Sequence, residues 1–115
     1  MMRSNVAVKK TGRQNAVATH SPTAAETSFT TVAATLSGGA IGRPLKLTAS
    51  GSVGGLIQIQ FGSQASYTLS VAPNQLPVEY IIPASAFPNQ VNSVNVLFQG
   101  FGAGTLVGIV EFETN

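Results

Sequence analysis

The segment Leu56-Ile57-Gln58-Ile59-Gln60-Phe61 decides the fold class, because apolar and polar side chains alternate along it. Successive side chains of a strand point to opposite faces, so Ile57, Ile59 and Phe61 would share one face and the two glutamines the other. Such alternation, bounded by glycine on both sides, is typical of a half-buried antiparallel strand. The segment therefore predicts a sheet that covers a core with one of its faces.

The same period of two recurs along most of the chain. It predicts further strands at residues 28–36, 43–49, 67–71, 78–82, 93–99 and 105–112. The side chains expected to face the core are Leu45, Leu47, Ala49, Tyr67, Leu69, Val71, Val78, Tyr80, Ile82, Val94, Val96 and Phe98. Segments rich in glycine or proline separate the strands and supply the turns. This spacing predicts an all-β fold, either a sandwich or a jelly roll, and we expect an antiparallel β-sandwich that is jelly-roll-like.

The N-terminal region differs from the rest in charge and in pattern. It contains most of the basic residues, Arg3, Lys9, Lys10 and Arg13, and its periodicity is weak. We therefore predict an extended N-terminal arm at residues 1–27 and a β-sandwich domain at residues 28–115. Fully extended, such an arm reaches about 90 Å, which is enough to cross a neighbouring subunit.

Two interpretations of the arm remain open. It is either an unanchored terminus or a segment that orders on a partner, by adding a strand to a sheet or by lying on an acidic surface. The alternation at residues 5–9 suits an added strand, and the arm could also supply an eighth strand to the sandwich. Its four cations are compatible with nucleic-acid contact but too sparse to favour it.

Composition favours a protein that assembles. Only 9% of the 115 residues are charged, against about 25% in ordinary domains. A domain of this size buries a modest core, and without cysteine it has no disulfide to stabilise it, so oligomerisation is the usual remedy. No apolar run follows the N-terminal cations, and none approaches the ~20 residues of a membrane span. We therefore expect neither a signal peptide nor a membrane contact.

Residues that could perform chemistry are few. The only histidine, His20, lies in the expected arm, where we predict an exposed side chain rather than a member of a catalytic triad. Glu111 and Glu113 would share one face of a strand, and we interpret them as a solvated strand end rather than a glycosidase pair. The glycines at 100–104 lack the Lys-Ser/Thr of a phosphate loop and predict a hairpin. We expect no catalytic, cofactor or metal site.

The last strand suggests a subunit contact, because it is apolar on both faces. Leu106, Val110 and Phe112 would face the core, which leaves Val107 and Ile109 facing outward. The outward apolar residues of the predicted strands form the predicted subunit interface: Ile81, Leu97, Val107 and Ile109. The alternative is a small apolar cluster under a loop or under the arm.

The polar strand faces carry amides and hydroxyls instead of charges, which suits an interface and also suits sugar binding. Sugar sites usually present aromatic platforms. The chain has no tryptophan, and its two tyrosines, Tyr67 and Tyr80, fall on the expected core faces. This pattern favours an interface over a lectin.

With its basic arm and its short strands, such as Leu45-Lys46-Leu47 and residues 56–61, the chain resembles the small jelly-roll proteins of virus particles. These include coat subunits and the cement or decoration proteins of tailed phages. The resemblance is architectural and transfers no functional residues. It implies a homo-oligomer, often a trimer, that joins a major capsid protein or another shell protein. A chain shorter than most coat subunits favours an accessory role.

We therefore expect a virion structural protein, made in the host cytoplasm and located in the capsid. The alternative is a β-sandwich module that binds carbohydrate or a cell surface. Components of a tail, a pilus or a surface layer also remain open, and an enzyme is the least favoured class.

Overall fold

Long-range strand pairing organises the fold. The computed structural model of the chain describes residues 12–61 and 66–114. The strands are β1 (Gly12–His20), β2 (Thr30–Thr35), β3 (Gly42–Gly51), β4 (Gly55–Ile59), β5 (Tyr67–Val71), β6 (Val78–Ile81), β7 (Ser93–Gly100) and β8 (Leu106–Thr114). Two 3₁₀ helices, Ser37–Gly39 and Ala84–Ala86, lie between strands, and no helix in the described residues is long and apolar enough to cross a membrane.

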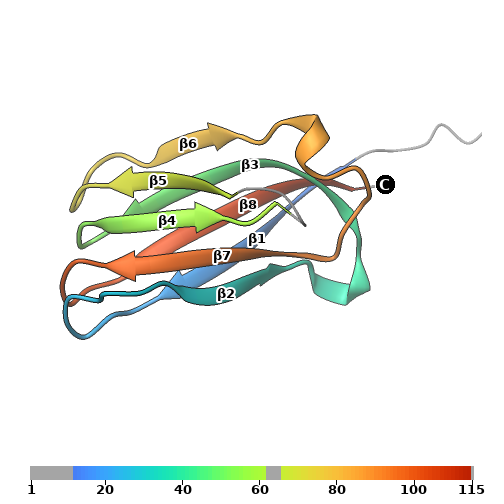
Figure 1. The fold of residues 1–115 in the computed structure, drawn as a ribbon. Coiled ribbons are helices and arrows are strands. Elements are labelled where there is room, and N and C mark those ends of the chain that lie inside the picture. Colours follow the sequence, from blue (N-terminus) through green and yellow to red (C-terminus); the bar gives the residue numbers. More distant parts are fainter. Residues whose placement is uncertain (1–11, 62–65, 115) are drawn as a thin grey trace, which may run out of the picture.

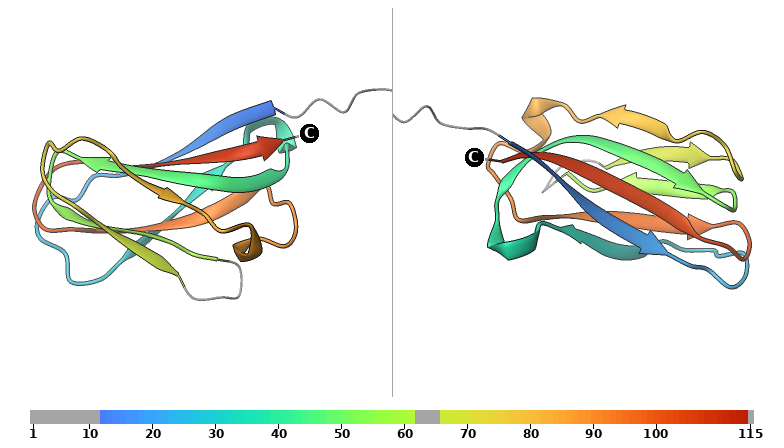
Figure 2. Two further views of the ribbon diagram at one scale, coloured as in Figure 1. Left: turned by 90° about the horizontal axis from the view of Figure 1, so that it is seen from above. Right: turned by 180° about the vertical axis from the view of Figure 1, so that it is seen from behind.

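The strands form two four-stranded antiparallel sheets that pack face to face (Figure 1). Sheet A has the order β1-β8-β3-β6, and sheet B has the order β2-β7-β4-β5. Seen from above, the sheets form two layers (Figure 2). Only β4 and β5 are both consecutive and paired, so every other connection crosses from one sheet to the other. The predicted all-β sandwich is confirmed.

Alternation places the core as predicted for most strands. Ile57 and Ile59 of β4, Val96 and Phe98 of β7, and Phe112 of β8 are fully buried between the sheets. Each such side chain contributes roughly 1.5–3 kcal/mol through the apolar surface that it removes from water. The predicted strands begin and end within two residues of the observed ones, and residues 67–71 match β5 at both ends. The core therefore follows from period-two patterning.

Two local predictions are wrong. A register shift between Pro44 and Lys46 marks a bulge in β3, so Pro44 faces the core and Leu45 is only half buried. An extra residue at a bulge resets the alternation that follows it. The glycines at 100–104 do not join a hairpin, because the strands on either side of them, β7 and β8, belong to different sheets.

The N-terminal strand corrects the expected boundary at residue 28. Residues 12–20 of the expected arm form β1, which pairs with β8 over its full length. Its inward residues Ala16 and Ala18 are 3% and 0% exposed, which makes them part of the core. The N-terminal region therefore supplies the eighth strand of the sandwich, which is β1. Residues 1–11, including the alternation at 5–9, lie outside the described residues.

Candidate interaction surfaces

The outer face of sheet A carries almost all the charge of the sandwich. We call it the charged face, and strand register assigns to it Arg13, Asn15, Val17, Thr19, Arg43, Lys46, Thr48, Ser50, Glu79, Ile81, Val107, Ile109, Glu111 and Glu113. Glu113 lies between Arg13, at 3.4 Å, and Arg43, at 3.3 Å. Lys46 and Glu79 pair at 3.2 Å. Within residues 12–61 and 66–114, Glu26 is the one charged Asp, Glu, Lys or Arg side chain outside this face.

The outer face of sheet B carries no charged side chain. We call it the uncharged face, and its residues are Thr31, Ala33, Thr35, Leu56, Gln58, Gln60, Thr68, Ser70, Ser93, Asn95, Leu97 and Gln99. Gln58 Nε2 donates to Thr68 Oγ1 at 2.9 Å, and Asn95 Nδ2 donates to Gln60 Oε1 at 3.2 Å. The polar groups therefore partly satisfy one another along the sheet.

The residues predicted as one subunit interface lie on opposite sides of the molecule. Ile81, Val107 and Ile109 belong to the charged face, whereas Leu97 belongs to the uncharged face. Ile81 is 69% exposed, and the other three are half buried. One flat contact cannot include all four residues, because the whole sandwich separates Leu97 from the rest.

The expected arm contacts divide in a similar way. Arg13 belongs to β1, where it pairs with Glu113 of the neighbouring strand. Its guanidinium contributes to the charged face, so it is held by the sandwich rather than by an arm. Arg3, Lys9 and Lys10 lie outside the described residues.

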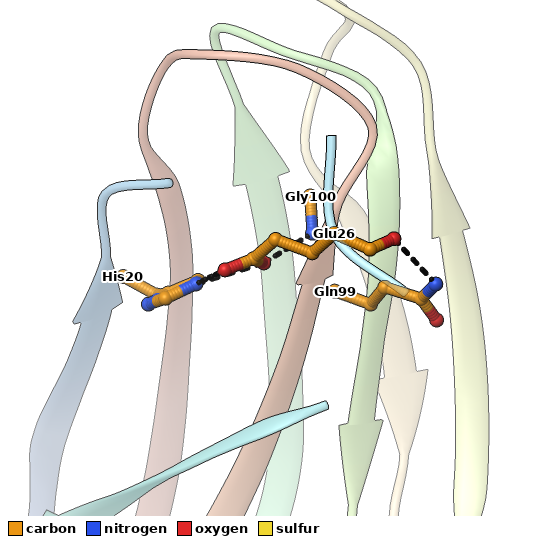
Figure 3. A network of polar contacts seen from close by, with 4 residues as sticks. All are labelled: His20, Glu26, Gln99 and Gly100. Carbon is orange, nitrogen blue, oxygen red and sulfur yellow. Dashed lines mark hydrogen bonds and ion pairs between the residues drawn. The ribbon is translucent and has the colours of Figure 1, made fainter. Parts of the chain in front are cut away.

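His20 is a fixed residue of the core edge, and the prediction of an exposed arm side chain is wrong. It ends β1 on the inward side, its side chain is 16% exposed, and its ring stacks on Phe98 with centroids 5.8 Å apart. His20 Nε2 lies 2.9 Å from both carboxylate oxygens of Glu26 (Figure 3). The β1–β2 connection folds back and places this carboxylate at the Nε2 edge of the ring.

Glu26 ties that connection to the end of β7 through its backbone and its side chain (Figure 3). Its N–H donates to Gly100 O at 2.8 Å, and its Oε1 accepts from Gly100 N–H at 2.8 Å. Its carbonyl accepts from Gln99 Nε2 at 2.9 Å. The Gly100 N–H, and then His20, hold the pKa of Glu26 below its ordinary value of 4.5.

The contacts of Glu26 have no local signal in the sequence. Its partner Gly100 lies 74 residues further along the chain, and glycine offers only its backbone. A β-carbon at Gly100 would overlap the ring of Pro22, so this position requires glycine. In an enzyme, a carboxylate that orients an imidazole can assist a general base. Here the hydrogen bonds of Glu26 to His20 and to the Gly100 N–H hold the β1–β2 connection against the sandwich.

An aromatic cluster fills the edge between β5 and β6. The rings of Tyr67 and Tyr80 stack 3.8 Å apart and nearly parallel, and Phe61 lies beside Tyr80. Tyr67 is 42% exposed, so its expected burial is only partial. Burial, and then Tyr67, raise the pKa of the Tyr80 phenol.

A cleft of about 180 Å³ lies next to this cluster, lined by Gln60, Phe87, Val91, Ser93, Val94 and Asn95. The Phe87 ring, which contacts Phe61 edge-on, gives it an apolar wall, and the bonded amides of Gln60 and Asn95 give it a polar one. The cleft is below the usual 300–1,000 Å³ of sites for drug-sized ligands, so it suits a single small ring.

In the part of the chain that the structure describes, no group of three or more His, Cys, Asp or Glu side chains is arranged to hold a metal ion. Searches with this chain against family models, curated proteins and solved structures found no match.

Proposed function

We propose that this protein is a structural subunit of a virus particle, a capsid cement or decoration protein or a minor capsid component. In this role it stabilises a shell through contacts between its own copies and with a major capsid protein or another shell protein.

The strand order supports the proposal. Pairing β1 with β8, β2 with β7, β3 with β6 and β4 with β5 is what results when one long antiparallel ribbon wraps into two sheets. From this nested order we infer a jelly roll, a fold frequent in viral capsids but also in lectins and cupins. Because a fold hosts many functions, the strand order alone does not choose among these classes.

The observation that carries the proposal is the separation of charge between the two outer faces. A free surface normally mixes charges of both signs, which keeps a protein dispersed in water. Here one whole sheet face lacks charge, which is expected of a surface that is covered in an assembly. Three further cations, Arg3, Lys9 and Lys10, precede the sandwich and could reach an acidic surface of a neighbour.

The first experiment is the mass of the full-length protein in solution, by light scattering after size exclusion over a range of concentrations. We expect a closed oligomer with a mass that is a multiple of 11.8 kDa. A variant lacking residues 1–11 should assemble more weakly while its circular dichroism is unchanged. A monomer at every concentration would contradict self-assembly.

A second candidate function is a module that binds carbohydrate, and a specific observation favours it. The half-exposed ring of Tyr67 and the cleft beside Phe87 bring aromatic surface and amide groups to one end of the sandwich. Sugars stack on aromatic rings and bond to amides. NMR titration with a panel of monosaccharides tests this function, with Asn95→Ala and Gln75→Ala as cleft and control variants. Shifts confined to the cleft, and lost only in Asn95→Ala, would favour it.

A further inference from the structure

The centre of the uncharged face has the composition of an interface core. Leu97 of β7 lies directly opposite Gln58 of β4, and Leu56 of β4 lies opposite Gln99 of β7. The two leucines are therefore diagonal neighbours on the two central strands of sheet B. Both are half buried. Hydroxyls of the edge strands β2 and β5 and amides along β4 and β7 surround them, which matches the apolar centre and polar rim of known interfaces.

The polar groups around this centre are already organised. Gln58 donates to Thr68, Asn95 donates to Gln60, and Gln99 donates to the carbonyl of Glu26, at 2.9, 3.2 and 2.9 Å. Side chains held in this way lose less conformational freedom when a partner covers them. Because no charge is present, covering the face also avoids the large cost of removing an ion from water. The opposite face would have to desolvate three ion pairs.

The absence of charge also limits what can cover the face. A partner with a strongly charged surface gains nothing there, and it leaves its own charges without counter-ions. A second copy of the same face brings amides, hydroxyls and leucines, and it introduces no like-charge repulsion about a two-fold axis. A second copy of the uncharged face can therefore cover the first without leaving any charge unpaired.

We propose that the uncharged face is the self-association surface of this protein, packing against the same face of a second copy with Leu56 and Leu97 at the centre. The inference rests on the proposed structural function and names the surface that performs it. Strand and residue spacings give the face roughly 400 Å² of flat area. This is about half of what each partner contributes to a standard interface, so the dimer should dissociate on dilution.

Charge insertion at matched positions tests the surface. Gln58 lies at the centre of sheet B opposite Leu97, and Thr48 lies at the centre of sheet A opposite Ile109. We expect Gln58→Lys to weaken association at least tenfold by light scattering over a concentration series, because two lysines would meet near the axis. Thr48→Lys adds the same charge beside Glu79 and should leave the mass unchanged. Thr68→Lys is a second variant on the uncharged face, and circular dichroism checks that each variant folds.

Crosslinking adds an independent readout, because the chain has no cysteine. Packed sheets lie about 10 Å apart, so a short bis-maleimide of about that span joins residues that face each other near the axis. Leu97→Cys should give covalent dimers, whereas Ile109→Cys should not.

The outcomes separate this inference from the proposed function. If oligomers persist in Gln58→Lys and Thr68→Lys but are lost in Thr48→Lys, or if only Ile109→Cys crosslinks, the surface is wrong and self-assembly stands. If the unmodified protein is a monomer at every concentration, both fail. Loss of association confined to the variants of the uncharged face, with crosslinking at Leu97→Cys alone, supports the inference.

Discussion

The two long edges of the sandwich are closed in opposite ways. Where β1 and β2 meet, the buried side chains are alanines: Ala16, Ala18 and Ala34 are each at most 3% exposed. Where β5 and β6 meet, the stacked rings of Tyr67 and Tyr80 join the sheets. Protein interiors keep a nearly constant packing density, so methyl groups require the sheets to converge, whereas rings span a wider gap. The residue volume at each edge therefore sets how far apart the sheets lie.

The largest expected effect comes from removing the alanine edge. Deleting residues 1–27 removes β1, the partner of β8 along its whole length, and with it two buried alanines and the His20–Glu26 contact. We expect this truncated protein to be unfolded by circular dichroism and by NMR dispersion. Deleting residues 1–11 keeps β1 and should leave a folded sandwich. A folded protein without residues 1–27 would show that the edge strand is dispensable.

The next effect tests the small volume of the same edge. Ala18 is fully buried, so Ala18→Leu forces a larger side chain between converging sheets and should lower the free energy of unfolding by about 1–3 kcal/mol. The neighbouring Val17 is 56% exposed on the other side of the strand. Val17→Leu should therefore change the free energy of unfolding by no more than about 0.5 kcal/mol. Urea unfolding measures both. Equal effects would mean that β1 has no preferred face.

The same contrast shows why β5 and β6 were predictable from the sequence whereas β1 was not. β5 and β6 carry large apolar residues on the inward side, so their alternation is clear. In β1 the inward residues are small or polar, Ala16, Ala18 and His20, while the more hydrophobic Val17 points outward. A pattern based on hydrophobicity therefore finds no strand in β1. The strand becomes stable only through β8, which lies some ninety residues away along the chain.

The sequence predicted some features of the interface residues and not others. The outward positions of Leu97, Val107 and Ile109 were predictable, because each alternates with buried neighbours in its own strand. Their separation onto two faces was not, because it depends on which sheet each strand joins. Nor could local pattern predict that Glu26 bonds to the backbone of Gly100. Periodicity determines the side of a strand, while topology determines the neighbours.

A smaller effect is expected at the aromatic edge. Tyr67→Ala removes the stacking on Tyr80 at a partly exposed site, and we expect this stacking to contribute about 0.5–1.5 kcal/mol to the free energy of unfolding beyond the burial of the ring. Tyr67→Phe keeps the ring and should be close to the unmodified protein. Urea unfolding of Tyr67→Ala, of Tyr80→Ala and of the variant that carries both changes completes a double-mutant cycle, which measures the coupling between the rings. A coupling near zero would show that the rings fill space without interacting specifically.

The smallest effect concerns the acid sensitivity of the β1–β2 connection. The Gly100 N–H, and then His20, lower the pKa of Glu26 from 4.5, so the carboxylate adds stability above pH 4.5 that is lost as pH falls through the lowered pKa. Glu26→Gln removes this titration, so its unfolding midpoint should decline less steeply below pH 4.5. Glu79→Gln removes a carboxylate from the exposed pair with Lys46 and serves as the control. If the unfolding midpoints of Glu26→Gln and Glu79→Gln fall alike below pH 4.5, a general loss of negative charge explains the acid response. A specific contribution from the hydrogen bond to Gly100 requires the two variants to differ.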